Sequence, residues 1–190
     1  TPTVSSVVFN GSESFTNRAR AQINYATDNY LTAEVWTLDN PTNTTANVVA
    51  TLSEAVDAND GLALVVSEYT GANNGVGNTG AATGNSIAPG VTFTTASSTS
   101  LICAGSSQGD PTSSPYSPGS GTTERADGAV GTAGMSYSAG EEAASGGSDT
   151  IGWTASVGTR WAMAAIELKA AAGGAAIPVL YHQRRQQGMS

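Results

Sequence analysis

The sequence predicts an all-β fold, an antiparallel two-sheet β-sandwich of about ten strands. Only 12% of the residues are charged and 6% are aromatic, while Gly, Ser, Thr, Ala and Asn are abundant. This composition is typical of short strands joined by turns of small residues. Apolar residues also alternate with a period of two, as a half-buried strand requires. A chain of 190 residues is long enough to bury a sizeable core in one domain.

The first third of the chain predicts a series of strands with legible turns. Residues 3–9 form an expected strand that ends at Asn10-Gly11, a dipeptide that favours a tight hairpin turn. Residues 21–26 alternate again. A meander follows, which we place in the middle of the sandwich: strands at 31–38, 47–52 and 62–69, with turns at 39–43 and 57–61. The apolar, β-branched run 62–69 is typical of a central strand covered on both faces.

The rest of the body alternates between strands and small-residue segments. Residues 71–90 contain only Val76 and Ile87 as sizeable apolar residues, so we expect a surface excursion there. Expected strands, a second excursion and an acidic turn follow: strands at 91–95, 101–104, 122–126, 134–138, 150–157 and 160–169, the excursion at 106–121 and the turn at 141–148.

The last of these strands has a rival interpretation, because Ala, Met, Glu, Leu and Lys are good helix formers. We favour a strand, since the preceding turn Gly158-Thr159 is short. Alternation then places four apolar residues on one face: Ala162, Ala164, Ile166 and Leu168.

Charge and composition exclude several classes of function. A net charge of −8 leaves too few basic residues to follow a phosphate backbone, so we expect no nucleic-acid partner. No stretch is apolar for the ~20 residues that a membrane-spanning helix needs, so we expect no membrane partner. Cys103 is the only cysteine, which excludes an intrachain disulfide, and its apolar surroundings predict a small buried side chain.

The sequence predicts no catalytic site, no cofactor and no established metal site. Glu141 and Glu142 are adjacent and would face opposite ways, which suits a solvated turn better than an acid and base pair. His182, the only histidine, lies in the C-terminal tail, which is poorly suited to hold a preorganised catalytic site. Asp57, Asn59 and Asp60 resemble the start of a calcium loop without its distant Glu, so a plain turn is favoured and calcium binding is left open.

Aromatic residues give an alternative function, carbohydrate binding. Trp36, Trp153 and Trp161 fall inside strand patterns, which favours core packing. Tyr69 and Tyr116 fall at a strand end and in a Pro-rich segment, where an exposed ring could stack on a sugar.

The composition changes abruptly after the body, residues 1–169. Residues 170–176 form an Ala/Gly linker, and residues 177–190 form an arm that is apolar and then basic. We expect this arm to bind a neighbouring subunit, by adding an edge strand or filling a groove, while packing on its own domain is left open. The expected binding residues are Ile177, Val179, Leu180, Tyr181, Arg184 and Arg185.

Several segments resemble jelly-roll-like β-sandwich structural proteins of tailed bacteriophages and bacterial surfaces. These segments are 4–11, 33–36 followed by 47–50, 67–71 and 161–169. The resemblance implies a non-enzymatic capsid decoration or head-fibre protein on a virion surface, or alternatively a secreted or cell-surface protein. It implies partners from the same assembly, as a homo-oligomer or capsid lattice, and supplies no active-site residues.

Overall fold

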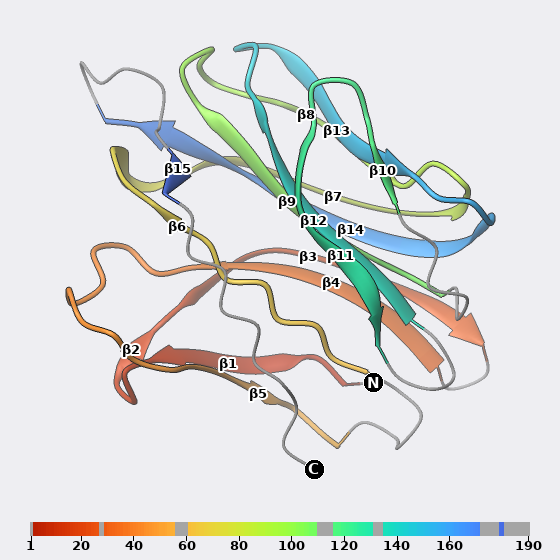
Figure 1. Cartoon of the computed structure of the whole chain (residues 1–190), viewed down its shortest axis with the longest axis horizontal. Coiled ribbons are helices and arrows are strands. Elements are labelled where there is room, and N and C mark those ends of the chain that lie inside the picture. The colour runs from red at the N-terminus through yellow and green to blue at the C-terminus, as the bar shows by residue number, and fades with distance from the viewer. Residues whose placement is uncertain are drawn as a thin grey trace.

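The computed structural model describes residues 2–26, 29–55, 61–109, 116–130, 135–171 and 179–180, and these contain strands and no helix (Figure 1). The predicted all-β class is confirmed, and the paired strands are all antiparallel. We expected about ten strands, whereas these residues form fifteen, four of which span only two residues. The strands are β1 Val4–Phe9, β2 Glu13–Ser14, β3 Thr16–Ala26, β4 Asn29–Thr37, β5 Val48–Leu52, β6 Glu68–Tyr69, β7 Ala72–Ser86, β8 Gly90–Thr94, β9 Leu101–Gln108, β10 Ser117–Pro118, β11 Thr123–Val130, β12 Met135–Ala143, β13 Ser148–Thr154, β14 Thr159–Ala170 and β15 Val179–Leu180.

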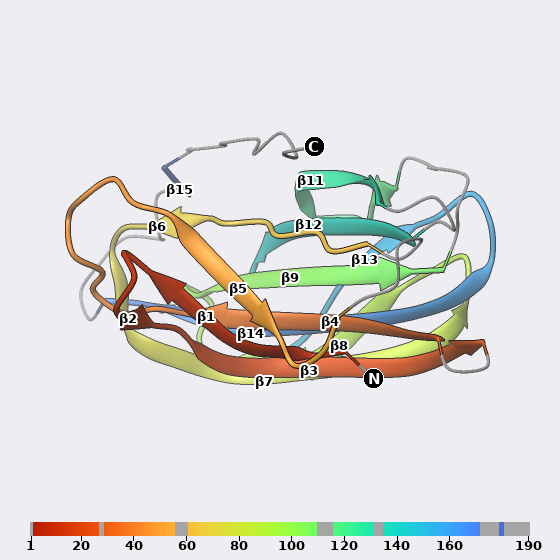
Figure 2. The same ribbon diagram turned by 90° about the horizontal axis from the view of Figure 1, so that it is seen from below.

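A five-stranded sheet with the order β11-β12-β9-β14-β7 forms the middle of the body. In Figure 1 the β10-β13-β8 sheet lies above it, and the β3–β4 hairpin and the β2-β1-β5 sheet lie below it. The turned view in Figure 2 shows β1 and β5 as a separate pair beside the hairpin. Sheets therefore cover both faces of the middle sheet, which is how such a charge-poor chain buries its small apolar residues.

Strand β14 is confirmed as a strand, and residues 161–167 are all buried. Ala162, Ala164 and Ile166 pack against the β3–β4 hairpin, with Leu168 partly buried in the same cluster, as alternation predicted. Trp161, Met163 and Ala165 point to the other face. They pack in a cluster to which β8, β9 and β13 contribute Val91, Ile102, Ile151 and Trp153.

The predicted hairpin at the start of the chain is also confirmed. β1 ends at Phe9, and Asn10 and Gly11 follow with φ angles of 52° and 72°. These positive angles favour Asn and Gly, and the chain returns as β2, which pairs with the end of β1. Since the described residues form no helix, they include no helix able to span a membrane.

The prediction of a central strand at 62–69 is wrong for most of that segment. Only Glu68 and Tyr69 form a strand, and residues 61–67 have no strand partner within the described part of the chain. β14 has the doubly covered environment that we assigned to this run, because its two faces pack in two separate core clusters.

The prediction of a surface excursion at 71–90 is also wrong. Residues 72–86 form β7, which pairs with β14 along most of its length. The glycines that made the segment resemble a loop provide space for large neighbours. A Cβ on Gly77 would collide with the Glu167 carboxylate, and one on Gly84 would collide with the Trp161 ring.

We expect Gly84→Val to destabilise the protein by about 1–3 kcal/mol, because the indole of Trp161 occupies the place of the new side chain. Asn85→Val is the matched control, since Asn85 is exposed on the same strand and valine favours strands. Urea unfolding of the two variants measures the difference. Equal stabilities would show that the Trp161 ring moves aside at little cost.

Three shorter predictions also need correction. β9 continues to Gln108 into the expected excursion 106–121, and β11 reaches Val130 beyond the short strand expected at 122–126. β12 continues to Ala143, so Glu141 and Glu142 belong to a strand and not to a turn.

Candidate functional site

A groove lies between the inner face of the β1–β5 pair, strand β4 and the segment 61–70, and we call it the β6 groove. Its volume is about 1220 Å³. Small-molecule sites have volumes of roughly 300–1,000 Å³, so this groove is wide enough for a segment of polypeptide. Its apolar lining includes Val4, Val7 and Phe9 from β1, Val48, Ala50 and Leu52 from β5, and Leu62, Leu64 and Val66 from the segment before β6.

One side of the groove exposes an unusual amount of apolar surface. Leu62, Leu64, Val65 and Val66 are 47%, 49%, 39% and 46% exposed, and we call residues 62–66 the apolar strip. Scattered apolar residues are ordinary on a protein surface, whereas a continuous run beside a groove is typical of an interaction site.

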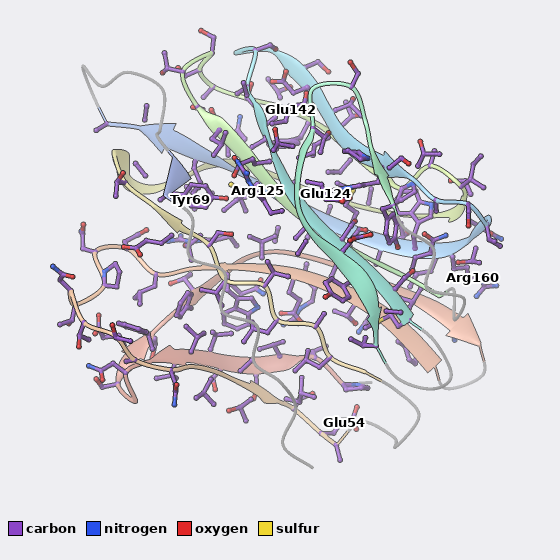
Figure 3. All side chains as sticks on the ribbon, in the orientation of Figure 1. Glu54, Tyr69, Glu124, Arg125, Glu142 and Arg160 are labelled. Carbon is purple, nitrogen blue, oxygen red and sulfur yellow. The ribbon has the colours of Figure 1, made fainter. Side chains whose placement is uncertain are left out.

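The strip leads to a buried polar cluster at β6. The Tyr69 hydroxyl donates a hydrogen bond of 3.0 Å to Glu141 Oε2, and the Arg125 guanidinium forms an ion pair with the other oxygen of the same carboxylate. Figure 3 shows Tyr69 and Arg125 near one another. Arg125 is the extra residue of a bulge in the β11–β12 pairing, which turns its side chain toward Glu141. Cys103 lies opposite Glu141 in the β12–β9 pairing.

Burial shifts the pKa values of the titratable groups in this cluster. Burial, helped by the nearby Cys103, raises the pKa of the Tyr69 hydroxyl well above its usual range. Burial also raises the pKa of the Cys103 thiol to about 12, so the thiol is protonated and unreactive at neutral pH. Both oxygens of Glu141 are occupied, which anchors β6 to the middle sheet.

Glu141 is buried, which contradicts its expected place in a solvated turn. Its neighbour Glu142 points the other way, as expected for adjacent strand residues, and accepts a hydrogen bond of 3.1 Å from Thr122 Oγ1. Burial raises the pKa of Glu142. The two carboxylates therefore have different partners and do not form an acid and base pair.

The structure brings together three of the predicted site residues: Tyr69, Val179 and Leu180. Val179 and Leu180 form β15, which pairs with β6 so that Val179 lies opposite Tyr69 and Leu180 lies opposite Glu68. In Figure 1 β15 lies beside β6 at one end of the molecule. The other predicted arm residues, Ile177, Tyr181, Arg184 and Arg185, lie outside the described residues, as does His182.

Tyr116 is not the exposed ring that its Pro-rich surroundings predicted. It is 4% exposed, packs in the core cluster with Trp153 and Trp161, and its hydroxyl lies 3.2 Å from Ser136 Oγ. The expected core packing of these two tryptophans is confirmed. Trp36 is half-buried and donates a hydrogen bond to Glu34.

Within the described ranges, no group of three or more His, Cys, Asp or Glu residues is placed to hold a metal ion. Asp57, Asn59 and Asp60 lie outside those ranges. Sequence reasoning missed the Arg125–Glu141 pair and the open groove. The available signal for the pair was an arginine and an acidic residue in two segments that follow one another in this charge-poor chain.

Comparisons of the chain with models of protein families, with curated proteins and with solved structures found no match.

Proposed function

We propose that the protein is a non-enzymatic structural subunit of a repeating assembly, and that its C-terminal arm, residues 177–190, joins it to neighbouring subunits. The proposal includes the setting that the resemblance implied, a virion surface with a jelly-roll-like sandwich as the repeating unit. A secreted or cell-surface assembly is the alternative setting.

The observation that carries the proposal is the pairing of β15 with β6 beside an open apolar groove. Val179 and Leu180, two arm residues, form a two-residue edge strand on β6 of the same chain, and the apolar strip lies beyond Ser67 in the segment that leads to β6. Addition of a strand to an exposed edge is a common way for a peptide arm to bind a folded domain. This pairing supports the proposal that the arm binds by adding a strand at this edge.

Charge supports the same interpretation. All fifteen acidic residues of the chain lie before residue 170, while Arg184 and Arg185 lie in the arm. An acidic body and a basic arm attract one another between copies, and this attraction weakens as salt is added.

The buried carboxylates of the described residues support a structural and non-enzymatic role. Glu34, Glu141, Asp149 and Glu167 each accept hydrogen bonds from side chains or backbone groups of the protein itself. The structure disfavours carbohydrate binding by the two tyrosines that we expected to stack on a sugar. Tyr116 is buried, and the Tyr69 hydroxyl is hydrogen-bonded to Glu141.

Deletion of residues 177–190 is expected to weaken self-association about tenfold or more, because the arm supplies the edge strand and both basic residues of the tail. Sedimentation velocity over a concentration series measures the effect, and circular dichroism checks that the body is still folded. The double variant Arg184→Glu/Arg185→Glu is the control for charge, since it keeps the apolar part of the arm. Unchanged association of the shortened protein would contradict the proposed function.

A further inference from the structure

We infer that the β6 groove is a binding site for a neutral small molecule that has a long apolar chain and one hydrogen-bonding head group, as a long-chain alcohol does. Binding of such a molecule goes beyond the proposed function, and either can fail without the other.

The β1–β5 pair turns an apolar face toward the groove. The groove-lining residues on this face are Val7, Phe9, Val48, Ala50 and Leu52. The two core clusters described above contain no residue from β1 or β5. The middle sheet lines the same groove with apolar side chains of its own: Met135, Ile166 and Leu168. Two apolar surfaces from different sheets therefore border one space that no side chain of the core clusters fills.

The size of this space suits a chain-like molecule. Ligand sites commonly have volumes of roughly 300–1,000 Å³. The groove, at about 1220 Å³, is somewhat larger. Leu62, Leu64 and Val66 add exposed apolar side chains to the lining. An apolar molecule that displaces water from these walls gains free energy in proportion to the apolar area that leaves water.

Ser107 supplies a hydrogen-bonding group that the protein does not use. It lies directly opposite Ala162 in the β14–β9 pairing, so its side chain is on the face of the sheet that packs against the β3–β4 hairpin. Ser107 lines the groove and is 4% exposed, yet its Oγ has no hydrogen-bond partner among the described residues. A buried hydroxyl without a partner is costly. The head group of a bound molecule supplies the missing partner.

The charges of the lining favour a neutral head group. Three of the four charged residues of the described lining are already in ion pairs: Glu34 with Arg20, Asp39 with Arg18 and Arg125 with Glu141. The fourth, Glu68, is exposed. A charged head group would lose its hydration in the groove without gaining a free counter-charge.

Fluorescence quenching of Trp36 tests the inference in the full chain. Trp36 lines the groove, whereas Trp153 and Trp161 pack in the core cluster on the other face of the middle sheet. The probe is ω-bromododecanol, because its bromine quenches a tryptophan that it approaches and its hydroxyl matches the expected head group. We expect saturable quenching that dodecanol reverses by competition, and little quenching in Trp36→Phe. Native mass spectrometry counts the bound molecules, and a full chain that shows neither quenching nor a bound molecule would overturn the inference.

A matched pair of variants places the molecule in the groove. Ala50→Phe puts a ring on the inner face of β5, and we expect it to weaken probe binding about tenfold or more. Val49→Phe is the control, because Val49 is 54% exposed on the outer face of the same strand. Equal affinities of the two variants would overturn the inference. Circular dichroism checks that both variants are folded.

Ser107→Ala tests the head group separately and adds no bulk. We expect it to weaken dodecanol binding several-fold, because one hydrogen bond is lost. Dodecanoate has the same chain with a charged head group, and we expect it to bind the unchanged protein about tenfold more weakly than dodecanol at neutral pH. Equal binding of dodecanol and dodecanoate would overturn the assignment of a neutral ligand.

The chain's own arm is the competing occupant of the groove. If the probe binds only after deletion of residues 177–190, the arm fills the groove and the inference is wrong. If the shortened and the full-length protein bind the probe equally, the groove is a ligand site whatever the deletion does to self-association.

Discussion

Glu167→Ala is expected to destabilise the protein by about 3–5 kcal/mol. Glu167 is fully buried in β14, and its carboxylate accepts hydrogen bonds from the backbone amides of Asn78, Ala96 and Ser97 at 3.0, 2.9 and 3.2 Å. Alanine leaves these three part-buried donors without their acceptor. Chemical denaturation at pH 7 measures the loss.

The same site predicts how stability changes with pH. Burial tends to raise the pKa of Glu167, but the hydrogen bonds from the amides of Asn78, Ala96 and Ser97 outweigh it and hold the pKa below its ordinary value of 4.5. The resulting stability is fully present above that ordinary value and is lost as the pH falls through the lower pKa of the folded state.

The amide in Glu167→Gln cannot titrate. We therefore expect the stability of this variant to fall less than that of the unchanged protein between about pH 5 and pH 2, the range in which carboxyl groups ordinarily titrate. Part of the fall persists, because Asp149 also has a lowered pKa: hydrogen bonds from Thr95 and Ser145 outweigh the effect of its burial. An identical pH profile for the variant would show that Glu167 does not contribute.

Glu34→Ala is expected to have a comparable effect, about 3–5 kcal/mol. The side chain of Glu34 is only 4% exposed, and its two oxygens accept four hydrogen bonds. The donors are Val4 N at 3.0 Å, Asn17 Nδ2 at 2.9 Å, Arg20 at 3.1 Å and Trp36 Nε1 at 2.8 Å. The carboxylate thus joins β1 to the β3–β4 hairpin, and its removal leaves several buried donors unpaired.

Glu13→Ala is the matched control for Glu34→Ala. Glu13 accepts one exposed hydrogen bond, from the Thr42 amide, so its loss is expected to cost less than about 1 kcal/mol. Thermal and urea unfolding of both variants gives the comparison. Similar costs for the two would mean that the network around Glu34 rearranges with water as a substitute.

The strands with clear alternation could be predicted from the sequence, because alternation is a local property. Residues 31–37 and 160–169 form strands as expected, and Ala162, Ala164 and Ile166 share a face. The turn at Asn10-Gly11 could be predicted for the same reason, since the dipeptide itself tolerates positive φ angles.

The partner of each strand could not be predicted. Residues 62–66 are as apolar as residues 162–166, and nothing local distinguishes the two runs. β14 is a buried strand because β7 and β9 pair with its two edges, whereas the apolar strip has no such neighbours within the described residues. Strand propensity of this kind depends on tertiary context.

The glycine-rich β7 and the polar cluster at β6 could not be predicted for the same reason, since both depend on residues far away in the sequence. Glycine is unfavourable in a strand unless a neighbour needs its space, and Trp161 supplies that reason at Gly84 from 77 residues further along the chain. Tyr69 was predicted as a site residue, but its role depends on Glu141, whose burial only the β12–β9 pairing reveals.

The position of β14 in the sheet order has a consequence for synthesis of the protein. β7 and β9 are not neighbours until β14 is inserted between them, although both precede it in the chain by many residues. During translation, β7 and β9 cannot pair with β14 until residue 170 has left the ribosome. Until then β7 and β9 lack the strand that pairs with both of them, and unpaired strand edges of this kind make a partly folded chain prone to aggregation.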